Sequence, residues 1–206
     1  MASVRSNVSQ QERGPAWQIA RLFPDQGELT EGDYLLLTER SNRLAEFTDG
    51  HIEVLPMPTT AHQRIVRYLI GILMTLAGNR GEVLFAPLRV RLRSGRFREP
   101  DVVFMLAEHA QRVGNEFWDG ADLVMEVVSE DDPGRDLQTK REEYAEAGIP
   151  EYWIVDPRLR TATVLKLEEG RYVTHSEARD AGIVRSSLLD GFTADVGAIF
   201  AAAGNA

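Results

Sequence analysis

The stretch that decides the fold is Asp122-Leu123-Val124-Met125-Glu126-Val127-Val128-Ser129. Its continuous apolar residues predict a strand that is buried on both faces. Glu126 lies in the middle of this run, where a carboxylate is costly unless it is paired or binds a cation. The stretch therefore predicts a central strand with one charged side chain whose role is not packing.

A second acid enters a similar apolar run, Arg98-Glu99-Pro100-Asp101-Val102-Val103-Phe104-Met105. We expect a strand over residues 97–106 that carries Asp101 and lies beside the strand over 123–128. Alone, Asp101 would be interpreted as a turn residue after a proline. Two acids on neighbouring strands, followed by a lysine, instead predict a divalent-metal site suited to phosphodiester hydrolysis.

Length and composition set the broad class. The 206 residues fit one domain, and we expect a flexible lead-in over 1–27 followed by a single domain over 28–206. With 43% hydrophobic residues the chain can bury a core, and no apolar run is long enough to span a membrane. The sequence has no cysteine, which excludes disulfides and thiolate metal sites. A cytoplasmic protein without a membrane partner is the default expectation.

The net charge of -9 argues against a nucleic-acid binder, which usually has a basic surface. Local charge differs, because arginines recur just before Asp101. They are Arg89, Arg91, Arg93, Arg96 and Arg98. This stretch fits equally well a positive groove on an acidic protein or ordinary alternation along a half-exposed strand.

Turn and cap residues divide the rest of the chain into helices and strands. The expected elements are a helix starting near 34–37, a hairpin over 44–55, a helix that is capped by Thr59 or Thr60 and ends near Gly78, a strand over 82–93 broken at Pro87, a helix over 135–147, a strand over 151–157, a hairpin around 169–170 and a tail helix over 194–203. Strand, helix and strand follow one another around Glu126. This order predicts an α/β fold with a mixed central sheet flanked by helices and additional β-hairpins.

Lys140, on the helix after the Glu126 strand, is the candidate catalytic cation. Asp136, Lys140 and Tyr144 share one helix face because they are four residues apart. The alternative for Asp136 and Lys140 is an ordinary surface ion pair. The backbone carbonyl of Val127 is a candidate third metal ligand if it points into the same cleft.

The ordered pair Pro100-Asp101 and Glu126-Val127-Val128-Ser129 resembles the PD-(D/E)XK nuclease superfamily. Further segments are similar to one branch of it, the Uma-two family of restriction endonucleases. These segments are Glu46-Phe47-Thr48-Asp49-Gly50, His62-Gln63-Arg64-Ile65-Val66, Arg135-Asp136-Leu137, Lys140, Tyr144 and residues 148–157. The similarity covers roughly residues 33–167. It implies a restriction-endonuclease-like fold and a Mg²⁺- or Mn²⁺-dependent endonuclease that acts as a homodimer. The expected substrate is DNA, and RNA is the alternative.

The resemblance assigns the metal to Asp101, Glu126 and the Val127 carbonyl, and the catalytic cation to Lys140. The superfamily places its lysine two residues after the glutamate, where this chain has Val128; in the similar branch the lysine comes from the following helix.

The resemblance also brings Glu46 near the cleft, as a further metal ligand or as a base behind the ligands, although the simpler interpretation is a solvent-facing strand acid. His62 is expected either to contact a phosphate or orient a ligand, or to be a polar residue at a helix start. Two rival hypotheses stay open. One is a catalytically silent binding or regulatory module, and the other is a structural protein in which a buried lysine or arginine neutralises Glu126.

Overall fold

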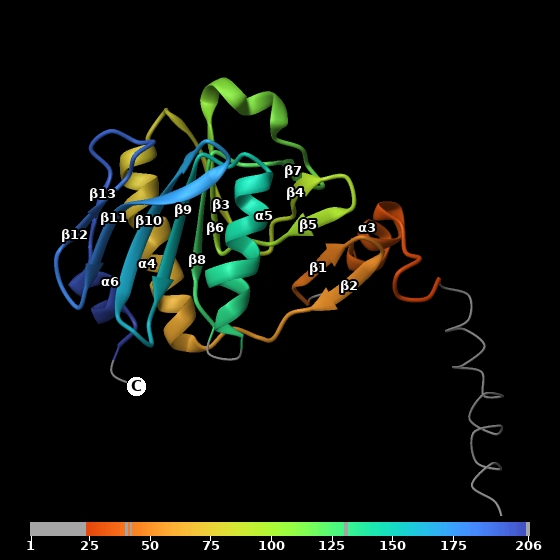
Figure 1. Cartoon of the computed structure of the whole chain (residues 1–206), viewed down its shortest axis with the longest axis horizontal. Coiled ribbons are helices and arrows are strands. Elements are labelled where there is room, and N and C mark those ends of the chain that lie inside the picture. Colours follow the sequence, from red (N-terminus) through yellow and green to blue (C-terminus); the bar gives the residue numbers. More distant parts are fainter. Residues whose placement is uncertain (1–23, 40, 42, 130–131, 205–206) are drawn as a thin grey trace, which may run out of the picture.

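The computed structural model describes residues 24–39, 41, 43–129 and 132–204. The lead-in expected over 1–27 lies outside the described residues up to residue 23. The described chain forms two main sheets with helices packed on them (Figure 1). Within this part of the chain, no helix has the length and apolar character needed to cross a membrane.

A six-stranded mixed sheet forms the centre of the molecule. Its strand order is β11-β10-β9-β8-β6-β3, and only β8 and β9 run parallel. The strands are β3 (Gly81–Phe85), β6 (Val102–Leu106), β8 (Leu123–Val127), β9 (Glu151–Asp156), β10 (Thr161–Glu168) and β11 (Arg171–Arg179). Every residue of β8 and β9 is buried, as the apolar run around Glu126 predicts.

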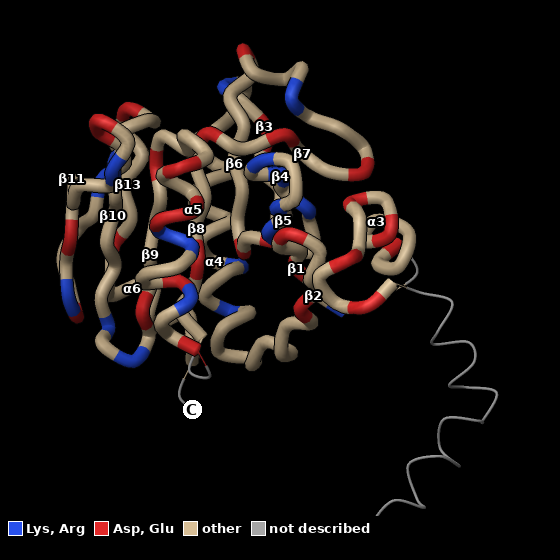
Figure 2. The backbone as a smooth tube through the Cα atoms, turned by 45° about the vertical axis from the view of Figure 1, so that its right-hand side comes forward, with Lys and Arg blue, Asp and Glu red and all other residues tan. Residues whose placement is uncertain are grey.

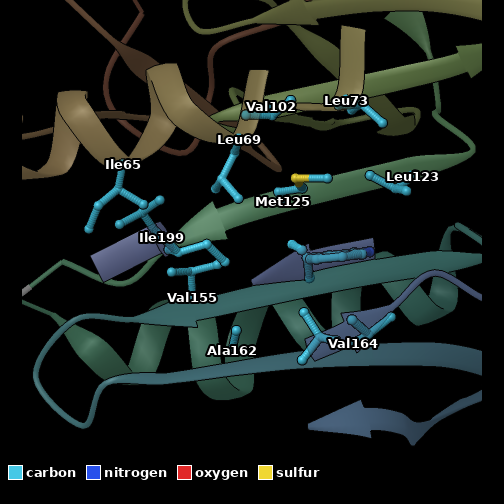
Figure 3. Packing of buried hydrophobic residues seen from close by; sticks show 14 of the residues in the cluster. Ile65, Leu69, Leu73, Val102, Leu123, Met125, Val155, Ala162, Val164 and Ile199 are labelled. Carbon is cyan, nitrogen blue, oxygen red and sulfur yellow. The ribbon is translucent and has the colours of Figure 1, made fainter. Parts of the chain in front are cut away.

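Helices cover both faces of this sheet (Figure 1). On one face lie α4 (Thr60–Ala77) and α6 (Val196–Ala202), and on the other lies α5 (Lys140–Glu146), which continues a π-helical turn over Arg135–Thr139. Ile65, Leu69 and Leu73 of α4 pack against Val102 and Met125 of the sheet (Figure 3). These three residues are four apart, so they lie on one side of the helix, and their packing holds α4 against the strands next to the two acids.

A five-stranded sheet lies beside the central one, in the order β2-β1-β5-β4-β7. Its strands are β1 (Ala45–Thr48), β2 (His51–Val54), β4 (Val90–Arg93), β5 (Arg96–Arg98) and β7 (Trp118–Asp119). The β1–β2 hairpin turns at Asp49 and Gly50, both with positive φ, as the Asp-Gly pair predicts. Tyr34 of α3 (Glu31–Glu39) stacks on Phe47 of β1. The remaining elements are the 3₁₀ helix η1 (Ala107–Arg112) and a two-stranded sheet of β12 (Ile183–Arg185) and β13 (Thr193–Asp195).

The predicted α/β class with a mixed sheet, flanking helices and extra hairpins is confirmed, but one strand prediction is wrong. Residues 97–106 do not form one strand: β5 belongs to the second sheet and β6 to the central sheet. Pro100 lies between them, and its missing N–H cannot continue a strand ladder. Asp101 therefore lies at the entry to β6, where the chain passes from one sheet to the other.

Candidate active site

Asp101 and Glu126 meet at one edge of the central sheet. The antiparallel register pairs Val102 with Met125, so that Asp101 stands opposite Glu126 one residue further along. Asp101 Oδ2 accepts a hydrogen bond from the Val127 N–H at 2.8 Å. Glu126 is only 3% exposed, so its carboxylate is held in the interior beside Asp101 rather than in solvent.

The ammonium group of Lys140 contacts the carboxylate of Glu126. Its Nζ donates to Glu126 Oε1 at 2.8 Å and lies 3.2 Å from Asp136 Oδ1. The Tyr144 hydroxyl donates to the same Glu126 oxygen at 2.6 Å. Asp136, Lys140 and Tyr144 are all buried, so the surface ion pair considered as an alternative for Asp136 and Lys140 is wrong.

Glu46 lies inside the same cluster. Its side chain is 1% exposed, so the solvent-facing interpretation is wrong. Among the described residues neither of its carboxylate oxygens has a hydrogen-bond partner. Three cations surround it at 3.6 Å: Lys140 Nζ near Oε1, and Arg98 Nε and Arg135 Nη2 near Oε2.

Arg98 and Arg135 also belong to this cluster, a role that was not predicted from the sequence. Arg98 also donates two hydrogen bonds to Glu143 of α5, at 2.7 and 2.5 Å. Arg135 pairs with Glu53 of β2. The available signals were their positions, since Arg98 precedes the Glu-Pro-Asp segment and Arg135 precedes Asp136. These arginines link the hairpin, the β5 strand and the helix that carries Lys140.

The carboxylates around Glu126 outnumber the cations that pair with them. Lys140 is shared by Glu126, Asp136 and Glu46, and Asp101 adds a further carboxylate. Burial raises the pKa of Glu126 to about 8; Lys140 opposes this rise, whereas Asp136 and Asp101 add to it. Carboxylates that repel one another in a buried site are stabilised when a divalent cation lies between them.

His62 faces the same point from the start of α4. Its Nε2 is 3.2 Å from Asp101 Oδ2 and 3.1 Å from the Val127 carbonyl oxygen, while its Nδ1 is buried without a partner in the described structure. Burial lowers the pKa of His62, but Asp101, Glu126 and the Val127 carbonyl raise it above its ordinary value overall. The Val127 carbonyl and Asp101 thus converge on one point.

The arginine stretch before Asp101 is largely neutralised. Arg91 pairs with Asp119, Arg93 with Asp49, Arg96 with Glu146 and Arg98 with Glu143. Figure 2 shows the basic segments of β4 and β5 among acidic segments of neighbouring elements. These four arginines are therefore ion-paired, Arg98 in the interior, and do not form an open positive groove.

The donor set at the sheet edge fits a magnesium-type ion. Within the described ranges, no group of three or more His, Cys, Asp and Glu side chains is arranged to hold a metal ion. Mg²⁺, however, commonly takes only one or two carboxylates and completes its shell with water and substrate oxygens. Asp101 and Glu126, with the Val127 carbonyl directed to the same point, have the chemistry of such a set.

Comparison with known proteins bears on the fold and on the family. No curated protein matches the chain. A solved structure titled a putative nuclease belonging to DUF820, from Anabaena variabilis ATCC 29413, has the same fold at a TM-score of 0.70 and 16% identity. The match covers 85% of this chain and 99% of that one. The Uma2 family model, described as "Putative restriction endonuclease", matches residues 32–197. Because that match spans most of the chain, the resemblance read from the sequence is confirmed, and the protein belongs to the Uma2 (Uma-two) family.

Proposed function

We propose that this protein is a metal-dependent endonuclease that hydrolyses phosphodiester bonds of DNA. One observation carries the proposal: Asp101 and Glu126 face each other across β6 and β8, with the buried Lys140 ammonium 2.8 Å from Glu126. Membership in a family described as restriction endonucleases supports nuclease chemistry. Asp101, Glu126 and the Val127 carbonyl would hold the ion, Mg²⁺ or Mn²⁺.

A bound Mg²⁺ or Mn²⁺ supplies a water of lowered pKa and stabilises charge on the phosphate oxygens. The protein would supply the rest. Burial by itself lowers the pKa of Lys140, but Glu126, Glu46 and Asp136 raise it well above its ordinary value. Lys140 thus stays an ammonium, which can donate a hydrogen bond to the attacking water or to a phosphate oxygen. Tyr144 and Asp136 would keep Glu126 and Lys140 in place.

The test is incubation of the purified protein with supercoiled plasmid, and separately with RNA, in Mg²⁺ or Mn²⁺. We expect the wild type to nick or linearise plasmid and Asp101→Asn to be inactive. Asp156→Asn is the control for loss of another strand-end carboxylate, because Asp156 is buried and is paired with Arg158. Cleavage that persists in both Asp101→Asn and Glu126→Gln, or an inactive wild type, would overturn the proposal. Cleavage of RNA alone would change the proposed substrate.

A catalytically silent binding or regulatory module is the second candidate. Glu126 Oε1 already accepts hydrogen bonds from Lys140 and Tyr144, which favours a structural pairing. The ion pairs of the four arginines before Asp101 and the net charge of -9 also argue against a DNA-binding groove along β4 and β5. This alternative predicts no metal-dependent cleavage under any condition.

A homodimer is part of the proposal because two cuts in a duplex need two sites, and sedimentation equilibrium tests it. The cytoplasm is the proposed compartment. The single domain over 28–206 stays a prediction, which limited proteolysis followed by mass spectrometry can test.

A further inference from the structure

An apolar groove lies between α3 and β2, at the edge of the five-stranded sheet. Its apolar lining includes Leu29, Leu37, Ala45, Ile52 and Val54. Leu37 and Val54 are 37% and 51% exposed, so this lining is open to water. Apolar surface that gathers in one exposed place is typical of an interaction site. The groove is therefore a candidate docking surface.

The outer edge of β2 forms one wall of this groove and offers backbone hydrogen bonds. Val54 lies opposite Ala45 of β1. The Ala45 N–H, however, donates to the Glu99 carboxylate, and its carbonyl accepts from the Tyr34 hydroxyl. The Val54 N–H and carbonyl therefore point away from β1, as they do at every second residue of an antiparallel strand. Within the described residues these two groups have no hydrogen-bond partner, and such an open strand edge pairs readily with another segment.

The described start of the chain runs along the same edge. The Gly27 N–H donates to the Gly50 carbonyl at 2.8 Å. The Gln26 side-chain amide then bonds to both backbone groups of Ile52, donating to the carbonyl at 3.1 Å and accepting from the N–H at 2.8 Å. Followed backwards from residue 27, the chain is therefore antiparallel to β2 and leads toward Val54.

Residues 1–23 join the described chain at the groove, because Pro24 is itself part of the lining. The last seven of them are Trp17-Gln18-Ile19-Ala20-Arg21-Leu22-Phe23. Four of these seven side chains are large and apolar, two of them aromatic, and residues 1–16 contain no aromatic residue. The apolar part of this terminal stretch is thus the part nearest to the groove along the chain.

We infer that residues 17–23 occupy this groove in their own chain and cover the outer edge of β2. Docking removes four large apolar side chains from water together with the open lining. The connection through Pro24 favours this segment over a second copy, because binding within one chain has a high effective concentration. β2 pairs with β1, which carries Glu46, so the docked segment would brace the hairpin that reaches the buried cluster.

Cross-linking tests which chain fills the groove. The sequence has no cysteine, so a short bismaleimide joins only the cysteines that are introduced. We expect an intrachain product in the double variant Gln18→Cys, Val54→Cys and none in Gln18→Cys, Val173→Cys. Val173 is the matched control, because it is a 40% exposed strand valine on β11, far from β2 (Figure 1). A product in both double variants, or in neither, would overturn the inference. A linked dimer from a mixture of the single variants Gln18→Cys and Val54→Cys would also overturn it, because the occupant would then be a second copy.

Tryptophan fluorescence provides a second measurement. Trp118 and Trp153 are 1% and 0% exposed, so the difference between each protein and its Trp17→Phe version isolates the emission of Trp17. We expect Trp17 to be protected from acrylamide quenching in the wild type and in Val173→Glu, and to lose this protection in Val54→Glu. Val54 is half exposed, so the fold should accept a glutamate there, which circular dichroism checks. A Trp17 that is fully quenched in the wild type, or that stays protected in a folded Val54→Glu, would contradict the inference.

Discussion

Two buried glutamates on neighbouring parallel strands have opposite surroundings. Glu151 begins β9 and is fully buried; Glu126 lies near the end of β8, beside Ile154 in the register. Neutral groups donate to both Glu151 oxygens at 2.5–2.8 Å: the Trp153 indole, the Ser186 and Ser187 hydroxyls and the backbone N–H groups of residues 187 and 188. Glu126 instead shares one lysine with two other acids.

The difference is the one that we expect between a structural carboxylate and the proposed catalytic one. Neutral donors that saturate Glu151 fasten the segment over 186–188 to the central sheet and leave the carboxylate no capacity for another partner. Glu126 has a surplus of negative charge around it and a carboxyl whose pKa burial raises to about 8. Because both acids are buried, the proposed role of Glu126 rests on the charge of its partners and on how many hydrogen bonds its carboxylate already accepts.

The substitution Glu126→Gln should have the largest effect of all, on the rate of cleavage. We expect cleavage of plasmid in Mg²⁺ or Mn²⁺ to fall by about 10³-fold or more, because a carboxylate proposed to hold the metal ion is removed. The midpoint of urea unfolding should hardly change, since a neutral amide avoids the cost of burying charge. A variant that keeps its cleavage rate but loses stability would favour the structural role for Glu126.

Lys140→Met should have the next largest effect. It leaves Glu126, Asp136 and Glu46 without their shared ammonium, and the free energy of unfolding should fall by about 3 kcal/mol or more. The double variant Lys140→Met with Glu126→Gln should recover part of this loss, because one unpaired charge is removed. Urea denaturation of all three variants measures the coupling. Strict additivity of the two substitutions would contradict it.

Glu151→Gln is the matching substitution in the carboxylate that we consider structural. The amide cannot accept all of the hydrogen bonds that the carboxylate receives, so we expect a loss of about 2 kcal/mol in the free energy of unfolding. Below its melting temperature the variant should cleave and bind metal like the wild type. If Glu151→Gln loses metal binding as Glu126→Gln does, the proposed distinction between the two acids is wrong.

The smallest effect is a pH-dependent one at Asp156. Burial raises the pKa of this carboxyl, but the hydrogen bonds and charge of Arg158 lower it below its ordinary value of 3.8. A lowered folded-state pKa stabilises the fold above pH 3.8, and this contribution is lost as the pH falls through the folded-state pKa. Asp156→Asn should therefore cost about 1 kcal/mol at pH 7 and progressively less as the pH falls through the folded-state pKa. A cost that does not vary with pH would assign it to packing.

Much of the fold follows from local sequence signals. The Asp49-Gly50 turn, the Thr59 cap and the apolar run around Glu126 each specify a local structure that the molecule adopts. The separation of β5 from β6 was not predicted, because alternation of apolar residues does not tell which sheet a strand joins. Pro100 was the available signal for the break.

The site was predictable only in part. Glu126 and Asp101 stood out because acids in apolar runs require partners, and the helix spacing grouped Lys140 with Asp136 and Tyr144. The burial of Glu46 was not predicted, because it depends on Arg98 and Arg135, which are 52 and 89 residues away along the chain. Such contacts arise from tertiary packing, and no local pattern encodes them.

The most direct test of the central claim is calorimetric titration of Mn²⁺ into the wild type, Asp101→Ala and the Asp156→Asn control. The account predicts one binding event in the wild type and in Asp156→Asn, and none in Asp101→Ala. Binding that is unchanged in Asp101→Ala, or a wild type that binds no divalent ion, would contradict it.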